Sequence, residues 1–293
     1  MDFVAIDVET ANPNLASICQ IGIAGFSDGV LSFEWKSYVD PQDYFHPMNV
    51  AVHGIDAPVV VGAPPFPKLA EIMFDKLRGT VVACHTPFDR IAIHQACTTH
   101  ALASPELTWL DTARVARRAW AECAQRGYGL ASVCSMIGYD FEHHDSLEDA
   151  KAAGQVLLAA SAATGLSVED WLVRVEQTLS GEPRQRSGGW HKASYVREGN
   201  PDGALAGAVI VFTGALRIQR REAAAQAAEI GCEVADAVNK RTTLLVVGDQ
   251  DLSRLAGHDK SSKHRRAEEL IAKGQPLRIL SESDFQRLAE LEA

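Results

Sequence analysis

Two acidic residues lie inside an apolar segment close to the start of the chain. Residues 3–9 read FVAIDVE, and their mostly apolar side chains predict a buried β-strand. Side chains two positions apart point to the same face of a strand, so we expect the carboxylates of Asp7 and Glu9 to lie side by side. Two neighbouring buried carboxylates repel each other unless a cation lies between them. The segment therefore predicts a divalent metal site built on a buried strand.

A third acidic residue follows a second predicted strand. Residues 80–84 are mostly apolar and run into a turn at Pro87, after which Asp89 opens an amphipathic helix over residues 90–101. This order places the Asp89 carboxylate near the end of a strand, where it can join the first two. Asp111 also precedes a helical segment, but there we interpret the carboxylate as an N-cap and not as a catalytic group.

His144 and Asp149 stand at the start of an alanine-rich helical segment. Ser146 and Asp149 have the spacing of a capping box, which predicts Ser146 as the N-cap and places Asp149 in the first helical turn. Five residues along a helix would turn the two side chains about 140° apart. His144 can therefore face the same site as Asp149 only from the preceding loop. A histidine on a loop suits proton transfer better than rigid metal ligation.

The order and context of these residues resemble the DnaQ-like exonucleases of the DEDDh type. The resemblance covers roughly residues 1–165 and includes CQIG at 19–22, VHGI at 52–55, DT at 111–112 and YGL at 128–130. It implies a ribonuclease-H-like α/β domain with a mixed sheet. The implied ligands of two Mg²⁺ or Mn²⁺ ions are Asp7, Glu9, Asp89 and Asp149. The resemblance also implies His144 as the general base and substrate contacts from Thr10 and His53.

A domain of this kind implies a metal-dependent 3′-to-5′ exonuclease that releases nucleoside 5′-monophosphates. DNA ends are the expected substrate and RNA ends the alternative, in repair or proofreading. Two positions depart from the family pattern, since Thr86 stands where asparagine is frequent and Glu148 where an apolar residue is frequent. These changes leave the implied ligands intact and affect the contacts to the terminal nucleotide. The alternative for the five principal residues is a degenerate domain in which they form buried salt bridges.

Other polar residues near these motifs lack the spacing of a metal site. We interpret the remaining histidines as surface or hydrogen-bonded residues: His46, His85, His94, His100 and His143. We interpret the acidic residues around the helix start as solvated charges: Asp140, Glu142, Asp145 and Glu148.

Length and composition bound the class of protein. The chain has 293 residues, 46% hydrophobic and 23% charged, so it is globular and long enough for two domains. Its net charge of −10 argues against a protein that coats nucleic acid. The longest apolar stretch, residues 204–216, is too short to cross a bilayer, and Asp2 and Asp7 argue against a signal peptide. Six cysteines without regular spacing indicate reduced thiols, so we expect a cytoplasmic protein without membrane contact.

The hydrophobic pattern divides the chain into three parts. Residues 1–180 form the expected exonuclease domain, 181–203 a linker rich in glycine and charged residues, and 204–293 a second domain. Within the linker, residues 190–197 interleave aromatic and basic side chains. Such a stretch can stack on nucleic-acid bases or dock on a neighbouring domain, and both interpretations stay open.

The second domain alternates predicted strands and helices. We expect strands at residues 208–212, 232–238, 242–247 and 277–280, and helices at 220–230, 261–273 and 281–291. This alternation predicts a small four-stranded parallel sheet with helices on both faces. The spacing of Ser281 and Asp284 predicts a capping box at the last helix.

The same domain resembles a BRCT domain of the bacterial DNA-ligase type. The matching segments are FTGAL at 212–216, KRTT at 240–243, SSK at 261–263 and SESDF at 281–285. The resemblance implies a phosphate site formed by four residues: Thr213, Gly214, Arg221 and Lys263. The implied partner is 5′-phosphorylated DNA or a phosphoprotein. Two alternatives stay open: that Thr213 and Gly214 form only a turn beside a solvated Lys263, and that the chain is an adaptor with a weak or silent nuclease domain.

Overall fold

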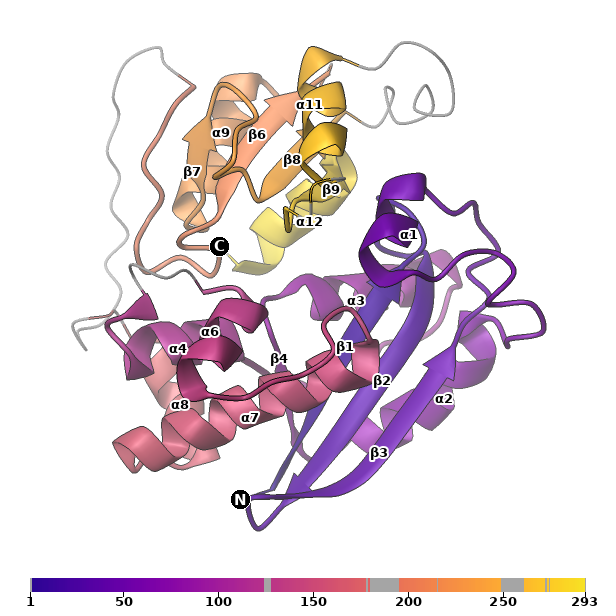
Figure 1. The fold of residues 1–293 in the computed structure, drawn as a ribbon, viewed down its shortest axis with the longest axis vertical. Helices are drawn as coiled ribbons and strands as arrows, with labels where there is room; N and C mark the ends of the chain where they lie inside the picture. Colours follow the sequence, from indigo (N-terminus) through magenta and orange to yellow (C-terminus); the bar gives the residue numbers. More distant parts are fainter. Residues whose placement is uncertain are drawn as a thin grey trace. The chain divides into compact units, whose positions relative to one another are not determined.

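In the computed structural model, the strand predicted from residues 3–9 lies inside a mixed sheet (Figure 1). Among the described residues this sheet has five strands in the order β3-β2-β1-β4-β5. The strands are β1 (Phe3–Thr10), β2 (Ile18–Ser27), β3 (Val30–Tyr38), β4 (Val81–Cys84) and β5 (Thr108–Asp111). The β1–β2 and β2–β3 pairs are antiparallel, while β1–β4 and β4–β5 are parallel. The expected mixed α/β sheet is confirmed.

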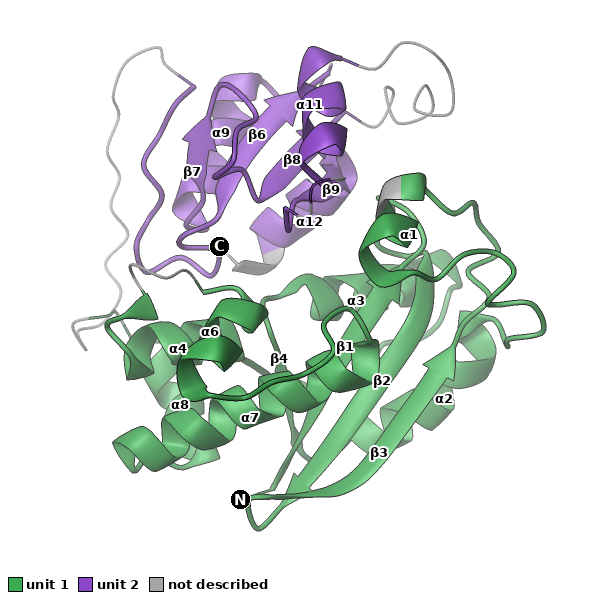
Figure 2. Ribbon diagram, viewed as in Figure 1, with its two compact units in different colours: residues 1–183 green, residues 184–293 purple. Residues whose placement is uncertain are grey.

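The chain divides into two units, Met1–Pro183 and Arg184–Ala293 (Figure 2). The structure describes residues 2–123, 128–177, 179, 195–214, 216–248, 261–271, 273 and 275–292. Residues 181–194 of the expected linker therefore lie outside the described residues, as does most of the aromatic and basic stretch at 190–197. Its last residue, Arg197, forms a β-bridge with Val234 of the second unit. The domain limits expected from the sequence stay a prediction.

Helices cover both faces of the first sheet. They are α1 (Pro47–His53), α2 (Phe66–Leu77), α3 (Phe88–Thr99), α4 (Thr112–Ala119), α6 (Leu130–Ile137), α7 (Ser146–Thr164) and α8 (Val168–Val175). The long helix α7 lies across one face and contacts β1 and β2, whereas α2 and α3 lie on the other face (Figure 1). The core beneath α7 includes Phe3 and Phe26, whose rings stack 4.8 Å apart, and the buried Trp171.

Glycine at position 22 sets how closely α7 approaches the sheet. A Cβ there would lie 2.2 Å from the backbone nitrogen of Leu147, so a larger residue would push the start of α7 away from β2. The amide of Ser146 also donates to Oε1 of Gln20 in β2 at 2.9 Å. These two contacts fix the first turn of α7 over the sheet, next to β1.

The second unit has a four-stranded sheet among its described residues, in the order β7-β6-β8-β9. Its elements are β6 (Val209–Thr213), α9 (Arg220–Glu229), β7 (Glu233–Ala235), β8 (Leu244–Val247), α11 (Ser262–Ile271), β9 (Arg278–Ser281) and α12 (Glu282–Glu292). All pairs are parallel, as predicted. The capping box is also confirmed, since the Asp284 amide donates to Ser281 Oγ at 3.0 Å and the Ser281 amide to Asp284 Oδ2 at 3.4 Å.

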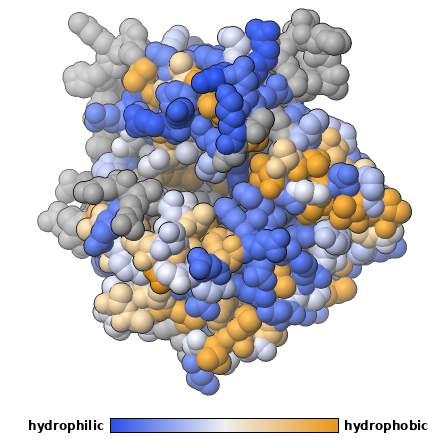
Figure 3. Space-filling view, in the orientation of Figure 1, coloured by the Kyte–Doolittle hydropathy of each residue, from blue (hydrophilic) through white to orange (hydrophobic). Residues whose placement is uncertain are grey.

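Hydrophobic and hydrophilic areas alternate on the face shown in Figure 3. In the first unit, the edge strand β3 exposes several large apolar side chains, including Val30 at 64% and Leu31 at 42%. No single helix among the described residues is long and apolar enough to cross a bilayer. Helices α7 and α8 together have the required length and apolar composition, but they are bent by 92° relative to each other. All six cysteines are free and buried.

Candidate active site

Strand β1 and the first turn of α7 bring three acidic side chains together. Asp7 and Glu9 point to the same face of β1, and Asp149 enters from α7. One carboxylate oxygen from each of the three lies within 4.8 Å of the others. Asp149 and Glu9 are buried, with 3% and 8% of their surface exposed, and Asp7 is partly buried. Three carboxylates held this closely form a site suited to a divalent cation, because carboxylate oxygens are the ligands that Mg²⁺ and Mn²⁺ favour.

Asp89 is tied to the same strand by a hydrogen bond. It lies in the first turn of α3 and is 2% exposed. Its Oδ1 accepts from the amide of Val8, the residue between Asp7 and Glu9, at 3.0 Å. The sequence thus placed Asp89 correctly at a helix start, and the hydrogen bond brings it to the strand that carries the first two carboxylates.

The start of α7 differs from the sequence prediction in its capping residue. The N-cap is Asp145, whose Oδ1 accepts from the amides of Leu147 at 3.0 Å and Glu148 at 3.4 Å. The prediction of Ser146 as the N-cap is wrong, because Ser146 is already the first helical residue and its amide bonds to Gln20. The sequence interpretation of Asp145 as a solvated charge is also wrong, because its Oδ2 accepts from Lys36 Nζ of β3 at 2.8 Å.

His144 lies on the loop before α7, as predicted. Its backbone has a φ of 71°, in the left-handed region. Its amide donates to Asp149 Oδ2 at 2.9 Å, so the carboxylate in the helix holds the loop that carries the histidine. His144 and Asp149 therefore face the same region from a loop and a helix, which a continuous helix would not allow.

The interpretation of His143 as a surface or hydrogen-bonded histidine is confirmed, but the sequence did not predict its place beside the acidic cluster. Its Nδ1 lies 2.6 Å from Asp149 Oδ1, and its ring stacks on that of His144 with centroids 4.0 Å apart. It is not an isolated surface histidine, although its ring is partly exposed. The sequence does contain a signal for this contact: His143 and His144 are adjacent and lie six and five residues before Asp149.

Thr10 and His53, the expected substrate contacts, are brought together at the end of β1. A β-bulge interrupts the pairing of β1 with β2 between Glu9 and Thr10. His53 Nδ1 accepts from the amide of Ile55 at 3.0 Å, so Nε2 carries the proton and donates to the Thr10 carbonyl at 3.1 Å. Burial lowers the pKa of His53, which keeps the ring neutral. Asn49 Nδ2 donates to the same carbonyl at 2.8 Å.

His85 and Asp111 have structural contacts beside the cluster. Nε2 of His85 lies 2.7 Å from the carbonyl of Tyr128 and Nδ1 lies 2.8 Å from Thr112 Oγ1, and burial lowers the pKa of the ring. Asp111 is the N-cap of α4, as predicted, and its Oδ1 accepts from the Ala113 amide at 2.8 Å.

The candidate phosphate site of the second unit is gathered around the end of β6. Lys263 Nζ donates to the Phe212 carbonyl at 3.0 Å, and Thr213 Oγ1 lies 2.8 Å from the hydroxyl of Ser261. Burial, followed by the charge of Arg220, lowers the pKa of Lys263. The guanidinium of Arg220 donates to the Gly214 carbonyl at 2.6 Å. The implied arginine, Arg221, is exposed on α9, one position beyond the arginine that contacts Gly214.

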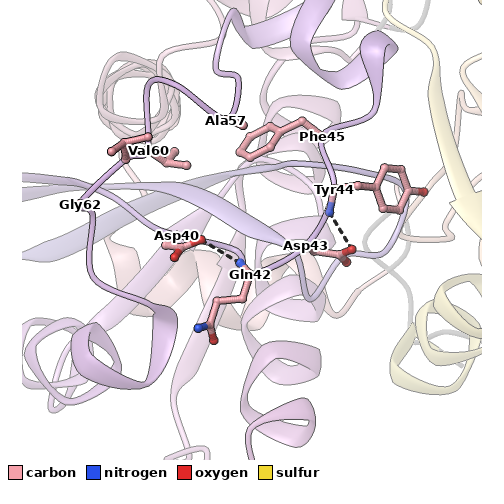
Figure 4. A pocket seen from close by; sticks show the side chains of 9 residues that line it. Asp40, Gln42, Asp43, Tyr44, Phe45, Ala57, Val60 and Gly62 are labelled. Atoms are coloured by element: carbon pink, nitrogen blue, oxygen red, sulfur yellow. Dashed lines mark hydrogen bonds between the residues drawn. The ribbon is translucent and has the colours of Figure 1, made fainter.

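A separate hollow of about 510 Å³ lies in the first unit, and the carboxylates of the cluster do not line it. Figure 4 shows its lining, which includes Asp40, Tyr44, Phe45 and Val60. The amide of Gln42 donates to Asp40 Oδ1 at 3.0 Å across its lower edge. These residues carry no arrangement that we assign to catalysis.

The first unit matches a known family of nucleases. The model of the exonuclease family (RNase_T) matches residues 4–157, which is more than half of the chain, and the chain belongs to this family. Full-length 3′-exonuclease is a similar solved structure, with a TM-score of 0.50, 16% identity and coverage of 56% of this chain and 61% of that one. An exonuclease I structure has a TM-score of 0.51 and 12% identity, covering 60% and 44%. At such low identities these structures establish the fold alone.

The second unit carries a BRCT domain. The BRCT family model (BRCA1 C Terminus domain) matches residues 200–273. A DNA ligase of Acidiphilium cryptum (strain JF-5) is 40% identical over 90 residues, which are 30% of this chain and 11% of the ligase. A DNA ligase of Gluconobacter oxydans (strain 621H) is 39% identical over 101 residues, covering 34% and 13%. The chain thus spans only 11–13% of the length of these curated relatives.

Proposed function

We propose that this chain is a DnaQ-like, DEDDh-type 3′-to-5′ exonuclease that releases nucleoside 5′-monophosphates from DNA ends. The observation that carries the proposal is the cluster of Asp7, Glu9 and Asp149, whose oxygens lie within 4.8 Å of one another in a member of the exonuclease family. Asp89 is the fourth carboxylate of the proposed set. It accepts a hydrogen bond from the amide of Val8, which lies between Asp7 and Glu9 in β1.

The donor set fits two Mg²⁺ or Mn²⁺ ions. All four side chains offer carboxylate oxygens, and an anionic cluster on a buried strand is stabilised by cations. When bound, divalent ions neutralise the carboxylates and the charge that develops on the scissile phosphate. The protein contributes the fixed positions, since β1, α3 and the first turn of α7 each hold their side chain through the contacts described above.

His144 is proposed as the general base. It lies on a loop and not in the helix, so its imidazole can approach an attacking water while its amide stays bonded to Asp149. Thr10 and His53 are proposed to contact the terminal nucleotide, because the bulge after Glu9 directs the backbone there away from regular pairing. The bond from His53 Nε2 to the Thr10 carbonyl fixes that backbone.

The BRCT domain is proposed to bind a phosphate through Thr213, Gly214, Arg221 and Lys263. Its ligand would be the 5′-phosphate of DNA or a phosphoprotein, which would place the nuclease at sites of DNA repair or replication. The contact of Lys263 with the end of β6 supports a cationic group at this position. The free, buried cysteines fit the cytoplasmic location that we propose.

Digestion of end-labelled oligomers tests the enzymatic proposal. The full chain is incubated with DNA and RNA labelled at either the 3′ or the 5′ end, with Mn²⁺ or with a chelator. We expect Mn²⁺-dependent release of labelled mononucleotide from the 3′-labelled DNA and a ladder of shortened products from the 5′-labelled DNA. Release of mononucleotide from the 5′ end would contradict the direction. An absence of any cleavage together with tight binding of a phosphorylated ligand would favour the adaptor.

A further inference from the structure

His143, His144 and Asp149 form a second group of metal-ligating side chains, which shares one carboxylate with the acidic cluster. Each offers one ligand atom, and the three atoms lie within 4.8 Å of one another. We propose that these three residues bind one Zn²⁺ ion and that the bound ion blocks hydrolysis. The binding is independent of the proposed function, whereas the inhibition rests on it.

The backbone brings both imidazoles to the same carboxylate. Adjacent side chains in an extended segment point to opposite sides. The left-handed backbone of His144, with a φ of 71°, breaks this pattern, and the two rings stack with 15° between their planes. Because the His144 amide also bonds Asp149 Oδ2, the loop is held in this conformation by the carboxylate itself.

The contact between His143 and Asp149 is a short hydrogen bond between two groups that can each ligate a metal ion. Nδ1 of His143 and Oδ1 of Asp149 are 2.6 Å apart, and two acceptor atoms approach this closely only when a proton lies between them. Zn²⁺ bonds imidazole nitrogen and carboxylate oxygen at about 2.0–2.2 Å, so neighbouring ligand atoms in a tetrahedral site are about 3.3 Å apart. Zn²⁺ lies in the plane of each imidazole that binds it, so the two stacked rings must also turn apart, and the partly exposed His143 ring is the one that can turn towards solvent.

The donor atoms select the ion. Two imidazole nitrogens and one carboxylate oxygen suit Zn²⁺, whereas Mg²⁺ favours the oxygen-only cluster of Asp7, Glu9 and Asp149. A Zn²⁺ ion bound in this way uses Asp149, a proposed ligand of the catalytic ions, and His144, the proposed base. Occupation of the nitrogen-rich site therefore removes both from hydrolysis.

Calorimetric titration of the metal-free full chain with Zn²⁺ tests the binding. The variant is His143→Gln, which keeps a hydrogen-bond donor for Asp149 but has no imidazole nitrogen. The matched control is His94→Gln, since His94 lies on α3 outside both clusters. We expect His143→Gln to weaken Zn²⁺ binding by more than about tenfold, while the control binds Zn²⁺ like the parent and all three proteins bind Mn²⁺ with affinities within about twofold.

Two results would overturn the proposal. Equal Zn²⁺ affinity of His143→Gln and the parent would show that His143 is not a ligand. An equal loss of Zn²⁺ and Mn²⁺ affinity in His143→Gln would show that His143 supports the whole acidic site and does not select an ion. If the variant does not fold, X-ray absorption of the Zn²⁺-loaded parent tests the site. Two imidazole ligands around the zinc ion would support the proposal, and a zinc ion without imidazole ligands would contradict it.

Inhibition is measured separately with Mg²⁺ and a labelled oligomer. We expect Zn²⁺ to stop hydrolysis by the parent and by His94→Gln at the same concentration, because both keep the two imidazoles and the carboxylate. His143→Gln should need more than about ten times as much Zn²⁺ for the same inhibition. If no Mg²⁺-dependent hydrolysis exists while Zn²⁺ still binds as expected, the proposed function fails and the Zn²⁺ site stands. If Zn²⁺ binds but does not inhibit, the inhibitory part is wrong.

Discussion

Substitutions of Asp145 and Ser146 test which of these two residues caps the start of α7. The structure shows Asp145 as the N-cap, whereas the sequence predicts Ser146. Asp145→Ala removes the hydrogen bonds to the amides of Leu147 and Glu148, a change that costs about 1 kcal/mol in typical N-caps. It also removes the ion pair between Asp145 and Lys36. Their side chains are 27% and 37% exposed, respectively, so this ion pair contributes about 0.2–1 kcal/mol. We expect a total loss of about 1–2 kcal/mol in the free energy of unfolding of the first unit.

Asp145→Asn and Ser146→Ala are the matched controls. Asparagine caps helices as well as aspartate does, so Asp145→Asn should lose only the charge and stay about 1 kcal/mol more stable than Asp145→Ala. The Ser146 hydroxyl is buried and has no hydrogen-bond partner among the described residues. Ser146→Ala should therefore match the parent within about 0.5 kcal/mol or be more stable.

Urea unfolding followed by tryptophan fluorescence measures these differences. The buried Trp171 reports on the first unit, and a loss of 1–2 kcal/mol lowers the midpoint by about 0.5–1 M at a typical slope of about 2 kcal/mol per M. If Ser146→Ala loses about 1 kcal/mol or more while Asp145→Ala does not, the serine is the cap and the reasoning fails.

Four further predictions concern the two sites and the pH dependence. Asp7→Ala should abolish hydrolysis with an unchanged or slightly higher unfolding midpoint, and hydrolysis at the parent rate would exclude Asp7 as a ligand. His144→Ala should lower turnover by about 10²- to 10⁴-fold with little change in Mg²⁺ affinity measured by calorimetry. Thr213→Ala combined with Lys263→Glu should leave oligomer hydrolysis unchanged and weaken binding of a 5′-phosphorylated duplex or a phosphopeptide by more than about 1.5 kcal/mol in a titration. Burial lowers the pKa of His85 below its ordinary 6.5, so the unfolded chain takes up the proton before the folded chain as the pH falls. The free energy of unfolding of the parent should therefore decrease as the pH is lowered from 6.5. In His85→Gln this decrease should be smaller.

Local patterns in the sequence were sufficient for the elements that carry the acidic cluster. The apolar segment at residues 3–9 predicted a strand, and the two-residue period of its side chains placed Asp7 and Glu9 on one face. The alternating elements of the second unit predicted its parallel sheet. The position of His144 on a loop followed from helical geometry alone. These features depend on residues close together in the chain.

Contacts between distant residues could not be predicted in the same way. The bond from Val8 to Asp89 and the pairing of β1 with β4 join segments about eighty residues apart, and residue spacing says nothing of such pairings. The cap was misjudged because Asp145 and Ser146 are both good N-caps, and the bond from Ser146 to Gln20 of β2 decided between them. The place of His143 beside the acidic cluster was not predicted because its contact depends on the left-handed backbone of the next residue.

Anomalous diffraction at the manganese edge tests the metal assignment most directly. Crystals of the full chain are grown with Mn²⁺ and a nucleoside 5′-monophosphate, the proposed product. We predict two Mn²⁺ peaks coordinated by Asp7, Glu9, Asp89 and Asp149, with the phosphate between them. Manganese peaks elsewhere in the first unit, with these four carboxylates free of metal, would contradict the assignment.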